Sequence, residues 1–291
     1  MLDDEMLKET PQSDNFSGSL YDTLDRTNLS LETHQELKSL CDNIGIDYLC
    51  TPFSRASVDI LDERLCVEMY KTGSGELTNL PFQKHIAAKG KAMIVSTGMA
   101  LEDEIGETVE TLKAYNVPLI LTHCVSAYPC PYDRVNLHNI PKYRAKWNVP
   151  VGLSDHTVSI YTSLGAVALG ACVVEKHFTL DRRLPGPDHS SSLEPYELGE
   201  LVRGCRAVFE ASGDEREIFP EEEQIVAWAR ESVVSVKFIP AGAKISNDMV
   251  SVKRPSPGPD GIPAKDLENI FGRRTIKDIQ TNTQLTWTML D

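Results

Sequence analysis

Short polar clusters follow several buried apolar runs, and these clusters carry the residues that could do chemistry. Two of them, KTGSGE (71–76) and STG (96–98), combine small hydroxyls with glycine, and the first begins with a lysine. Such groups suit an oxyanion such as phosphate, because hydroxyls and backbone N–H groups donate hydrogen bonds and lysine supplies charge. Ser154 at a third run adds another hydroxyl. Ordinary loops share this composition, so the spacing leaves both an anion site and a plain loop open.

His156 and His177 each follow one of two consecutive apolar runs. If the runs are neighbouring strands, about 4.8 Å apart, the two side chains could share one divalent cation. Neutral imidazole suits Mn²⁺, Zn²⁺ or Fe²⁺, and water and substrate oxygens can complete the shell of a catalytic metal. Two hydrogen-bonded histidines without a metal are the alternative.

Two loops add further candidates for a site. Tyr128 begins the proline-rich stretch YPCPY (128–132), which is stiff enough to hold the phenol ring over the strand ends. Asp188 lies in RRLPGPDHSSSLEP (182–195), where its carboxylate could accept hydrogen bonds from a polyol. A structural turn is the alternative for the first, and a turn or helix N-cap for the second.

The polar clusters need elements that bring them together, and six near-continuous apolar runs alternate with helical patterns. The runs are DYLCTPF (47–53), CVEMYKTGS (66–74), AMIVSTG (92–98), PLILTHC (118–124), VPVGLSDH (149–156) and CVVEKHFT (172–179). Such runs are typical of parallel strands buried on both faces, so the repeated units predict an α/β fold. No GxGxxG or GxxxxGK(S/T) motif follows a run, which disfavours a nucleotide-binding open sheet. Polar residues at every strand end favour a (β/α)₈-type barrel, where all ends ring one mouth.

Three segments are predicted along the chain. Residues 1–213 form the barrel-type domain, and the charged stretch 214–230 forms a linker. Residues 231–291 contain short alternating runs, PAG and PGPDG turns and one short helical pattern, which indicate a small, mostly β module.

Composition excludes some classes of protein. The chain has 291 residues and a formal net charge of -14, which argues against nucleic acid as the main partner because phosphate backbones need clustered Lys and Arg. No run approaches the ~18 apolar residues of a membrane span, so no membrane partner is expected. Seven cysteines without a CxxC pair indicate reduced thiols in a cytoplasmic protein.

Taken together, KTGSGELTN, STGM, HCVSAYP, GLSDHT and EKHFT, followed by GPDHSSSLEP, resemble the sialic acid synthase family. The C-terminal segment with VKRP resembles the antifreeze-like (SAF-type) domain that ends these proteins. The resemblance runs in order along the whole chain. It implies an enzyme that condenses phosphoenolpyruvate with an N-acetylated hexose, such as N-acetylmannosamine or its 6-phosphate, and releases phosphate. It also implies a divalent metal, most often Mn²⁺ with Mg²⁺ or Co²⁺ as alternatives. The expected assembly is a homodimer in which the antifreeze-like domain of each chain covers its partner's barrel mouth.

The resemblance also implies roles for single residues, all of them expectations at this stage. The phosphoenolpyruvate-binding residues are Thr51, Lys71, Ser74, Ser96, Ser126 and Ser154. His156 and His177 match the metal ligands, and Glu76 and Tyr128 line the reaction centre. Tyr128 and Asp188 contact the sugar, together with Arg254, which reaches the partner's site.

The sequence departs from the pattern of the family at the start of the chain. Six strand–helix units occupy residues 1–213, about 35 residues each, so eight would need about 280. We therefore expect a barrel that lacks its first two strand–helix units. In the family, these carry an acidic residue in an Ile-Gly-x-Asn-His-x-Gly context and a Lys-x-Gln sequence. A misassigned start, a split gene and a true truncation are the possible explanations, and an incomplete gene prediction or fragment is favoured.

Two kinds of function stay open at this point. The first is a sialic acid synthase that is complete only with upstream sequence. The alternative is a truncated, non-catalytic remnant or subunit that dimerises through the antifreeze-like domain. A different phosphoenolpyruvate-condensing barrel, such as a heptulosonate phosphate synthase, is a weaker third reading because those families lack the VKRP-type module.

Overall fold

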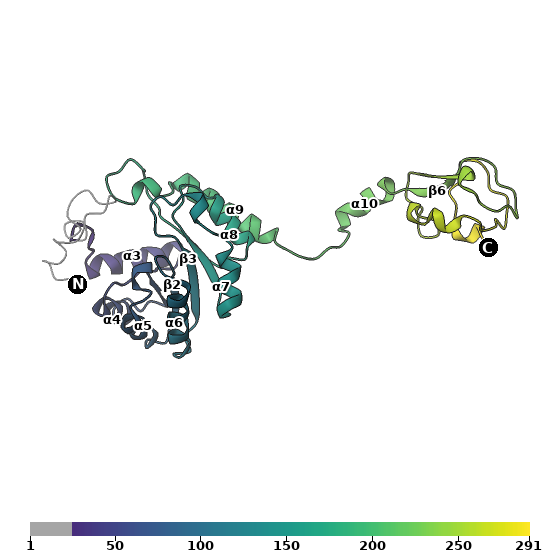
Figure 1. The fold of residues 1–291 in the computed structure, drawn as a ribbon. Coiled ribbons are helices and arrows are strands. Elements are labelled where there is room, and N and C mark those ends of the chain that lie inside the picture. Colours follow the sequence, from purple (N-terminus) through teal and green to yellow (C-terminus); the bar gives the residue numbers. More distant parts are fainter. Residues whose placement is uncertain (1–24) are drawn as a thin grey trace. The chain divides into compact units, whose positions relative to one another are not determined.

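The computed structural model describes residues 25–291, and the chain divides into two compact units, Met1–Gly213 and Asp214–Asp291. Figure 1 shows the elements of both units along the chain. The first 24 residues of the predicted barrel domain lie outside the described residues.

Within residues 25–213, five parallel strands form one sheet in the order β1-β2-β3-β4-β5. They are β1 (Met69–Thr72), β2 (Ala92–Ser96), β3 (Leu119–Cys124), β4 (Val151–Asp155) and β5 (Val174–Lys176). Each strand pairs with the next one along the chain, so all carboxyl ends lie at one rim. The sheet is curled, because Lys71 Nζ on edge strand β1 lies 3.2 Å from Glu175 Oε1 on edge strand β5. The predicted α/β fold, a part of a barrel wall, is confirmed.

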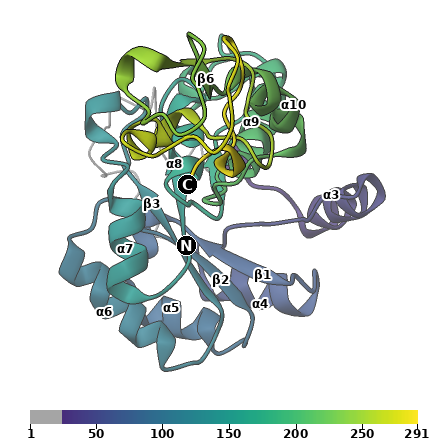
Figure 2. The same cartoon turned by 90° about the vertical axis from the view of Figure 1, so that its right-hand side faces the viewer.

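Helices precede, separate and follow the strands, and most of them pack on the outer face of the curled sheet (Figures 1 and 2). They are α3 (Leu31–Ile44), α4 (Arg55–Glu63), α5 (Leu80–Ala87), α6 (Glu102–Lys113), α7 (Asn139–Trp147), α8 (Tyr161–Ala168) and α9 (Pro195–Glu210). In α6, Ile105, Val109 and Leu112 recur at helical spacing and join the same buried core as Val95 and Leu121 of the strands. No helix among the described residues is long and apolar enough to cross a membrane.

The prediction of a strand over 47–53 is wrong, because this segment has no regular secondary structure. An apolar run becomes a strand only when a neighbour satisfies its backbone groups. Among the described residues, the adjacent strand β1 pairs with β2 alone. The segment is tied down by side chains instead, since the Tyr48 hydroxyl lies 2.6 Å from His34 Nδ1 on α3.

The second unit is small and rich in β structure, as predicted. Helix α10 (Pro220–Ala229) lies within the segment predicted as a linker. In the described residues that follow, β6 (Ser232–Ser235) pairs antiparallel with β7 (Val250–Lys253), and isolated bridges extend the pairing. Val233, Ile262 and Leu285 are fully buried in its own core, so this unit has the apolar centre of an independent domain.

Gly152 in β4 occupies a place where a larger residue does not fit. A Cβ there would lie 2.4 Å from the carbonyl oxygen of Val173, which accepts the Leu153 N–H at 2.9 Å. We expect Gly152→Ala to push β5 away from β4 and to lower the free energy of unfolding by about 1–3 kcal/mol, measured by urea denaturation. Gly213→Ala is the control, since nothing lies within 4 Å of its Cβ position. Equal stability of the two variants would contradict this packing.

Candidate active site

The rim formed by the strand ends brings most of the predicted site residues together. Register sets this arrangement, because Cys124 pairs with Ser154 and Asp155 pairs with Lys176 across adjacent strands. Most of the predicted residues lie at the last positions of a strand or within four residues of its end, as in the βα loops that carry active sites on parallel barrels. These residues are Lys71, Ser74, Ser96, Ser126, Tyr128, Ser154, His156 and His177.

A group of small polar side chains converges on the backbone of Gly98. The hydroxyl of Ser74 accepts a hydrogen bond from the Gly98 N–H at 3.1 Å and lies 3.4 Å from Cys124 Sγ. Cys124 Sγ is in turn 3.9 Å from Ser126 Oγ. A Cβ on Gly98 would lie 2.4 Å from Ser126 Oγ and 2.6 Å from Ser74 Oγ. Glycine is therefore required here for the hydroxyls to approach the backbone so closely.

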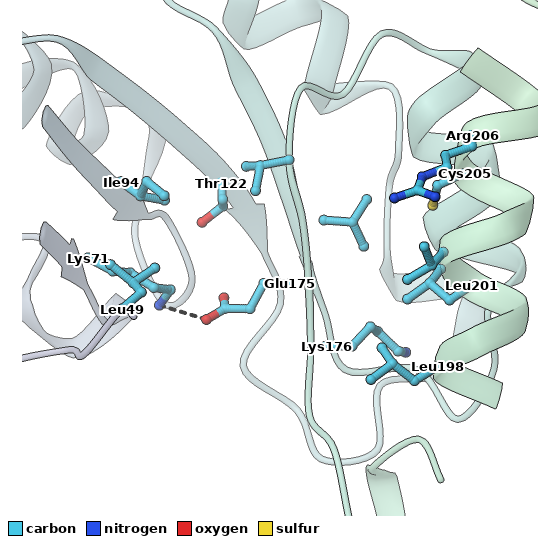
Figure 3. Close-up of a pocket in the computed structure, with 13 residues that line it drawn as sticks. Leu49, Lys71, Ile94, Thr122, Glu175, Lys176, Leu198, Leu201, Cys205 and Arg206 are labelled. Atoms are coloured by element: carbon cyan, nitrogen blue, oxygen red, sulfur yellow. Dashed lines mark ion pairs between the residues drawn. The ribbon is translucent and has the colours of Figure 1, made fainter. Parts of the chain in front are cut away.

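Lys71 supplies positive charge beside these hydroxyls. Its side chain is 12% exposed, and its ammonium pairs with Glu175 across the open side of the sheet (Figure 3). A cavity of about 530 Å³ opens next to this ion pair. Apolar side chains of α9, including Leu198 and Leu201, form much of its lining, and neither His156 nor His177 belongs to it. The cavity therefore lies along the open edge of the sheet, and the histidine pair is not part of its lining.

Three further phosphoenolpyruvate-binding candidates differ in how they are held. The Ser96 hydroxyl is buried and lies 2.8 Å from Thr122 Oγ1. Ser154 is buried between its register partners Cys124 and Glu175. Thr51, at the end of the segment wrongly predicted as a strand, is half-buried and makes no hydrogen bond to these residues within the described part of the chain.

His156 and His177 lie side by side, with ring centroids 5.2 Å apart. Nδ1 of His156 lies 2.8 Å from the carbonyl oxygen of Val125. Because a carbonyl only accepts, Nδ1 carries the proton, and Nε2 of the neutral ring keeps a lone pair. The Tyr128 ring packs on both, with centroids 4.1 Å from His156 and 5.4 Å from His177.

This donor set fits a catalytic divalent cation. Fixing one ring nitrogen on a carbonyl is the usual way to direct the other nitrogen at a metal. Asp188 Oδ2 lies 3.7 Å from Nδ1 of His177, within ion-pair range but beyond hydrogen-bond distance. No group of three or more His, Cys, Asp and Glu side chains among the described residues could hold a metal ion. A cation at the two imidazoles therefore needs substrate or water oxygens to complete its shell.

Burial and close contacts shift several pKa values at this rim. Burial raises the pKa of Tyr128 to about 12, so the phenol stays protonated. Burial also lowers the pKa of His177, against the opposing charge of Asp188. Burial opposes charge on Cys124 and His156 as well, but their mutual contact outweighs it, so the pKa of the thiol falls and that of the imidazole rises.

Besides Thr51, two predicted residues are not joined to this group. Glu76 accepts a hydrogen bond from Asn79 Nδ2 at 2.7 Å, at the start of α5, and contacts none of the rim hydroxyls in the described structure. Arg254 belongs to the second unit, where its Nε donates to the carbonyl oxygen of Ala229 at 2.9 Å.

The structure adds two residues to which sequence reasoning gave no role. Cys124 lies between Ser74 and His156, and Glu175 is the partner of Lys71. Both are register partners of Ser154. The alternation of strand side chains was the available signal, because it places Cys124 on the same face as Thr122.

Comparison with known proteins agrees with this fold. The sequence matches the NeuB family over residues 2–217 and the SAF domain over residues 230–291. It is 41% identical to the N,N'-diacetyllegionaminic acid synthase of Campylobacter jejuni, covering 86% of this chain and 75% of that protein. It is 37% identical to the N-acetylneuraminate-9-phosphate synthase of Mus musculus, covering 86% and 70%. The crystal structure of N-acetylneuraminic acid synthetase from Leptospira borgpetersenii superposes with a TM-score of 0.67 at 32% identity, covering 70% of this chain and 72% of that one.

The curled parallel sheet and its polar rim define an α/β synthase-type protein with a C-terminal β module. The chain belongs to the NeuB family, whose relatives named above are synthases of sialic-acid-type sugars.

Gly98 gives a direct test of the hydroxyl cluster. We expect Gly98→Ala to weaken the binding of inorganic phosphate about tenfold, or about 1.4 kcal/mol, because the new methyl group displaces Ser74 and Ser126. Isothermal titration calorimetry measures the effect. Gly75→Ala, in the turn Ser74–Glu76 after β1, is the matched control because nothing lies within 4 Å of its Cβ position. Unchanged affinity in Gly98→Ala would place the anion elsewhere.

Proposed function

We propose that this protein condenses phosphoenolpyruvate with an N-acetylated hexose, N-acetylmannosamine or its 6-phosphate, to give a nonulosonate and inorganic phosphate. The observation that carries the proposal is the pairing of two imidazoles, 5.2 Å apart, with a lysine and converging hydroxyls at the same rim. The relatives that make N-acetylneuraminate 9-phosphate and legionaminic acid support it. The seven cysteines are free thiols, which supports a reducing cytoplasm as its location.

In this proposal, Lys71 binds the phosphate of phosphoenolpyruvate and the small hydroxyls bind its phosphate and carboxylate oxygens. The hydroxyls are those of Thr51, Ser74, Ser96, Ser126 and Ser154. Lys71 is paired with Glu175. The incoming phosphate therefore either shares the Lys71 ammonium with that carboxylate or displaces the carboxylate from it. Charge-assisted hydrogen bonds of this kind are stronger than neutral ones, which favours the dianionic phosphate over water.

His156 and His177 would hold the divalent cation, with Mn²⁺ preferred and Mg²⁺ or Co²⁺ as alternatives. When bound, such a cation acts as a Lewis acid that polarises the aldehyde oxygen of the sugar. The protein's own part is to present Nε2 of His156 by holding Nδ1 on Val125. The Tyr128 ring covers both imidazoles and limits the access of water to them.

The proposed reaction has the following bond changes. C3 of phosphoenolpyruvate attacks the aldehyde carbon and forms the new C–C bond, and the aldehyde oxygen takes up a proton. The cationic centre left at C2 takes water, which loses a proton, and the resulting hemiketal phosphate expels phosphate by C–O cleavage. Carboxylates beside the site stabilise the developing positive charge and move these protons. Glu175 beside Lys71 is the carboxylate that the rim offers for this part. Glu76, in the turn after β1, would have to turn from Asn79 toward the site to join it.

Asp188, Tyr128 and Arg254 would bind the sugar. The Asp188 carboxylate lies beside His177, so hydroxyls of a sugar bound there can donate to it. Arg254 is an exposed cation of the SAF module. We propose that it reaches the site of the partner chain in a homodimer, where it contacts the N-acetyl group.

A phosphate-release assay tests the reaction. The full chain is given phosphoenolpyruvate, Mn²⁺ and one sugar at a time: N-acetylmannosamine, its 6-phosphate or a diacetamido hexose. We expect release with at least one sugar, together with the nonulosonate by mass spectrometry. His156→Ala and His177→Ala should abolish it, while His138→Ala, an exposed histidine beside α7, should not. No release with any sugar, from a folded dimer, would favour the non-catalytic alternative.

Mixing two inactive variants tests the contribution of Arg254 across the dimer. His156→Ala destroys its own site, whereas Arg254→Ala destroys the site of its partner. A random 1:1 mixture of C₂ dimers is therefore expected to recover about a quarter of wild-type activity, because half the dimers hold one intact site of two. The control is a mixture of Arg254→Ala with wild type, which should keep the activity of its wild-type share. If that control is active while the mixture of the two variants stays inactive, Arg254 acts within its own chain.

A further inference from the structure

An ion pair with buried side chains lies at the ends of the two strands that lead to the histidines. Lys176 Nζ is 3.4 Å from Asp155 Oδ2, and the two side chains are only 2% and 0% exposed. Asp155 and Lys176 are register partners at the ends of β4 and β5. The next residue along each strand is a histidine, His156 on one and His177 on the other. The pair therefore joins the two strand ends at the last position before the imidazoles.

Every polar group of this pair is engaged, and its partners lie in the loop that follows His156. The Asp155 carboxylate accepts the Thr157 N–H at 2.9 Å and the hydroxyls of Thr162 and Ser163 at 2.7 and 2.6 Å. The Lys176 ammonium donates to the carbonyl oxygens of Thr157 at 2.6 Å and Ser159 at 3.0 Å. The pair thus fixes the backbone just after His156 to β5 and to the start of α8.

Stability alone does not account for such a pair. Removing two charges from water is costly, and replacement of a buried ion pair by packed apolar residues is often neutral or stabilising. An apolar pair, however, cannot hold the carbonyls of Thr157 and Ser159 in one position. Directional hydrogen bonds that orient a neighbouring metal ligand are a common use of buried polar groups.

Independent contacts hold the histidines from other sides. His156 is fixed through Nδ1 to Val125, and the backbone carbonyl of His177 accepts the Leu193 N–H at 2.8 Å. Neither contact links the two histidines to each other. Among the described residues, the only ion pair between β4 and β5 is Asp155–Lys176.

We propose that Asp155 and Lys176 are positioning residues that set the separation and orientation of His156 and His177. This inference rests on the proposed function, in which the two imidazoles hold a divalent cation. Neither residue contacts substrate in this role. The pair acts on the cation through the backbone that carries the ligands.

The test uses the full chain and a paired substitution, Asp155→Leu with Lys176→Met, which removes both charges and leaves none buried alone. Two readouts are made on each variant. Electron paramagnetic resonance of free Mn²⁺ gives the affinity for Mn²⁺ alone. Spectra of ¹⁵N-labelled histidine in metal-free protein report the tautomer of His156. The control is Glu102→Gln, which removes a surface carboxylate that pairs with Lys142 and Lys146 between α6 and α7.

We expect the paired variant to stay folded by thermal unfolding and to bind Mn²⁺ about 10- to 100-fold more weakly. Its His156 should also lose the single Nδ1–H tautomer, because a shifted strand end no longer holds the ring at the Val125 carbonyl. Glu102→Gln should match wild type in both readouts. If the paired variant does not fold, Ser163→Ala, which removes one hydrogen bond to Asp155, takes its place with the same expected direction and a smaller effect.

The two proposals fail in different ways. If wild type binds no Mn²⁺, but the substitutions still scramble the histidine tautomer, the metal site fails and the positioning role stands. If a folded variant keeps wild-type histidine spectra and wild-type Mn²⁺ affinity, the positioning role is overturned while the metal site stands.

Discussion

The parallel register of β1 to β5 is the constraint on which the rest of the structure depends. Parallel pairing places every carboxyl end at the same edge, so residues far apart in sequence become neighbours there. A slip of one residue would turn each side chain to the opposite face of the sheet. Cys124, Ser154 and Glu175 stand in one row across β3, β4 and β5, and the histidines follow two residues further along β4 and β5. The site is therefore a property of the pairing rather than of any single loop.

The local chemistry also resolves an apparent conflict with the overall charge. The chain has a net charge of -14, yet the proposed substrate phosphoenolpyruvate is anionic. Lys71 is largely shielded from solvent beside the hydroxyl cluster, so its interaction with an anion is less screened than that of a surface lysine. Its partner Glu175 balances this charge in the structure. Global charge thus says little about what the rim can bind.

Sequence reasoning recovered most of the fold because five apolar runs alternated with segments that were mostly helical in pattern. The run at 47–53 looked equally apolar but failed as a strand, since a strand also needs a neighbour to pair with, and apolar composition does not reveal that. The site residues on strand ends, such as His156 and His177, could be predicted because strand ends share one rim. Cys124 was missed, because a buried thiol in an apolar run looks like a core residue unless the alternation of side chains along β3 is followed to its end. The contact of Glu175 with Lys71 depends on the curl of the sheet, which no local pattern encodes.

The central claim is that one rim holds a cation at the histidine pair and the phosphate of phosphoenolpyruvate at the neighbouring hydroxyls. The ³¹P relaxation rate of phosphoenolpyruvate bound to the Mn²⁺-loaded protein tests this directly, because a paramagnetic ion relaxes only nearby nuclei. We predict a strong enhancement over the Mg²⁺-loaded protein, and its loss when His156 and His177 are both replaced by alanine. Bound phosphoenolpyruvate whose ³¹P relaxes alike with Mn²⁺ and Mg²⁺ would contradict a shared site.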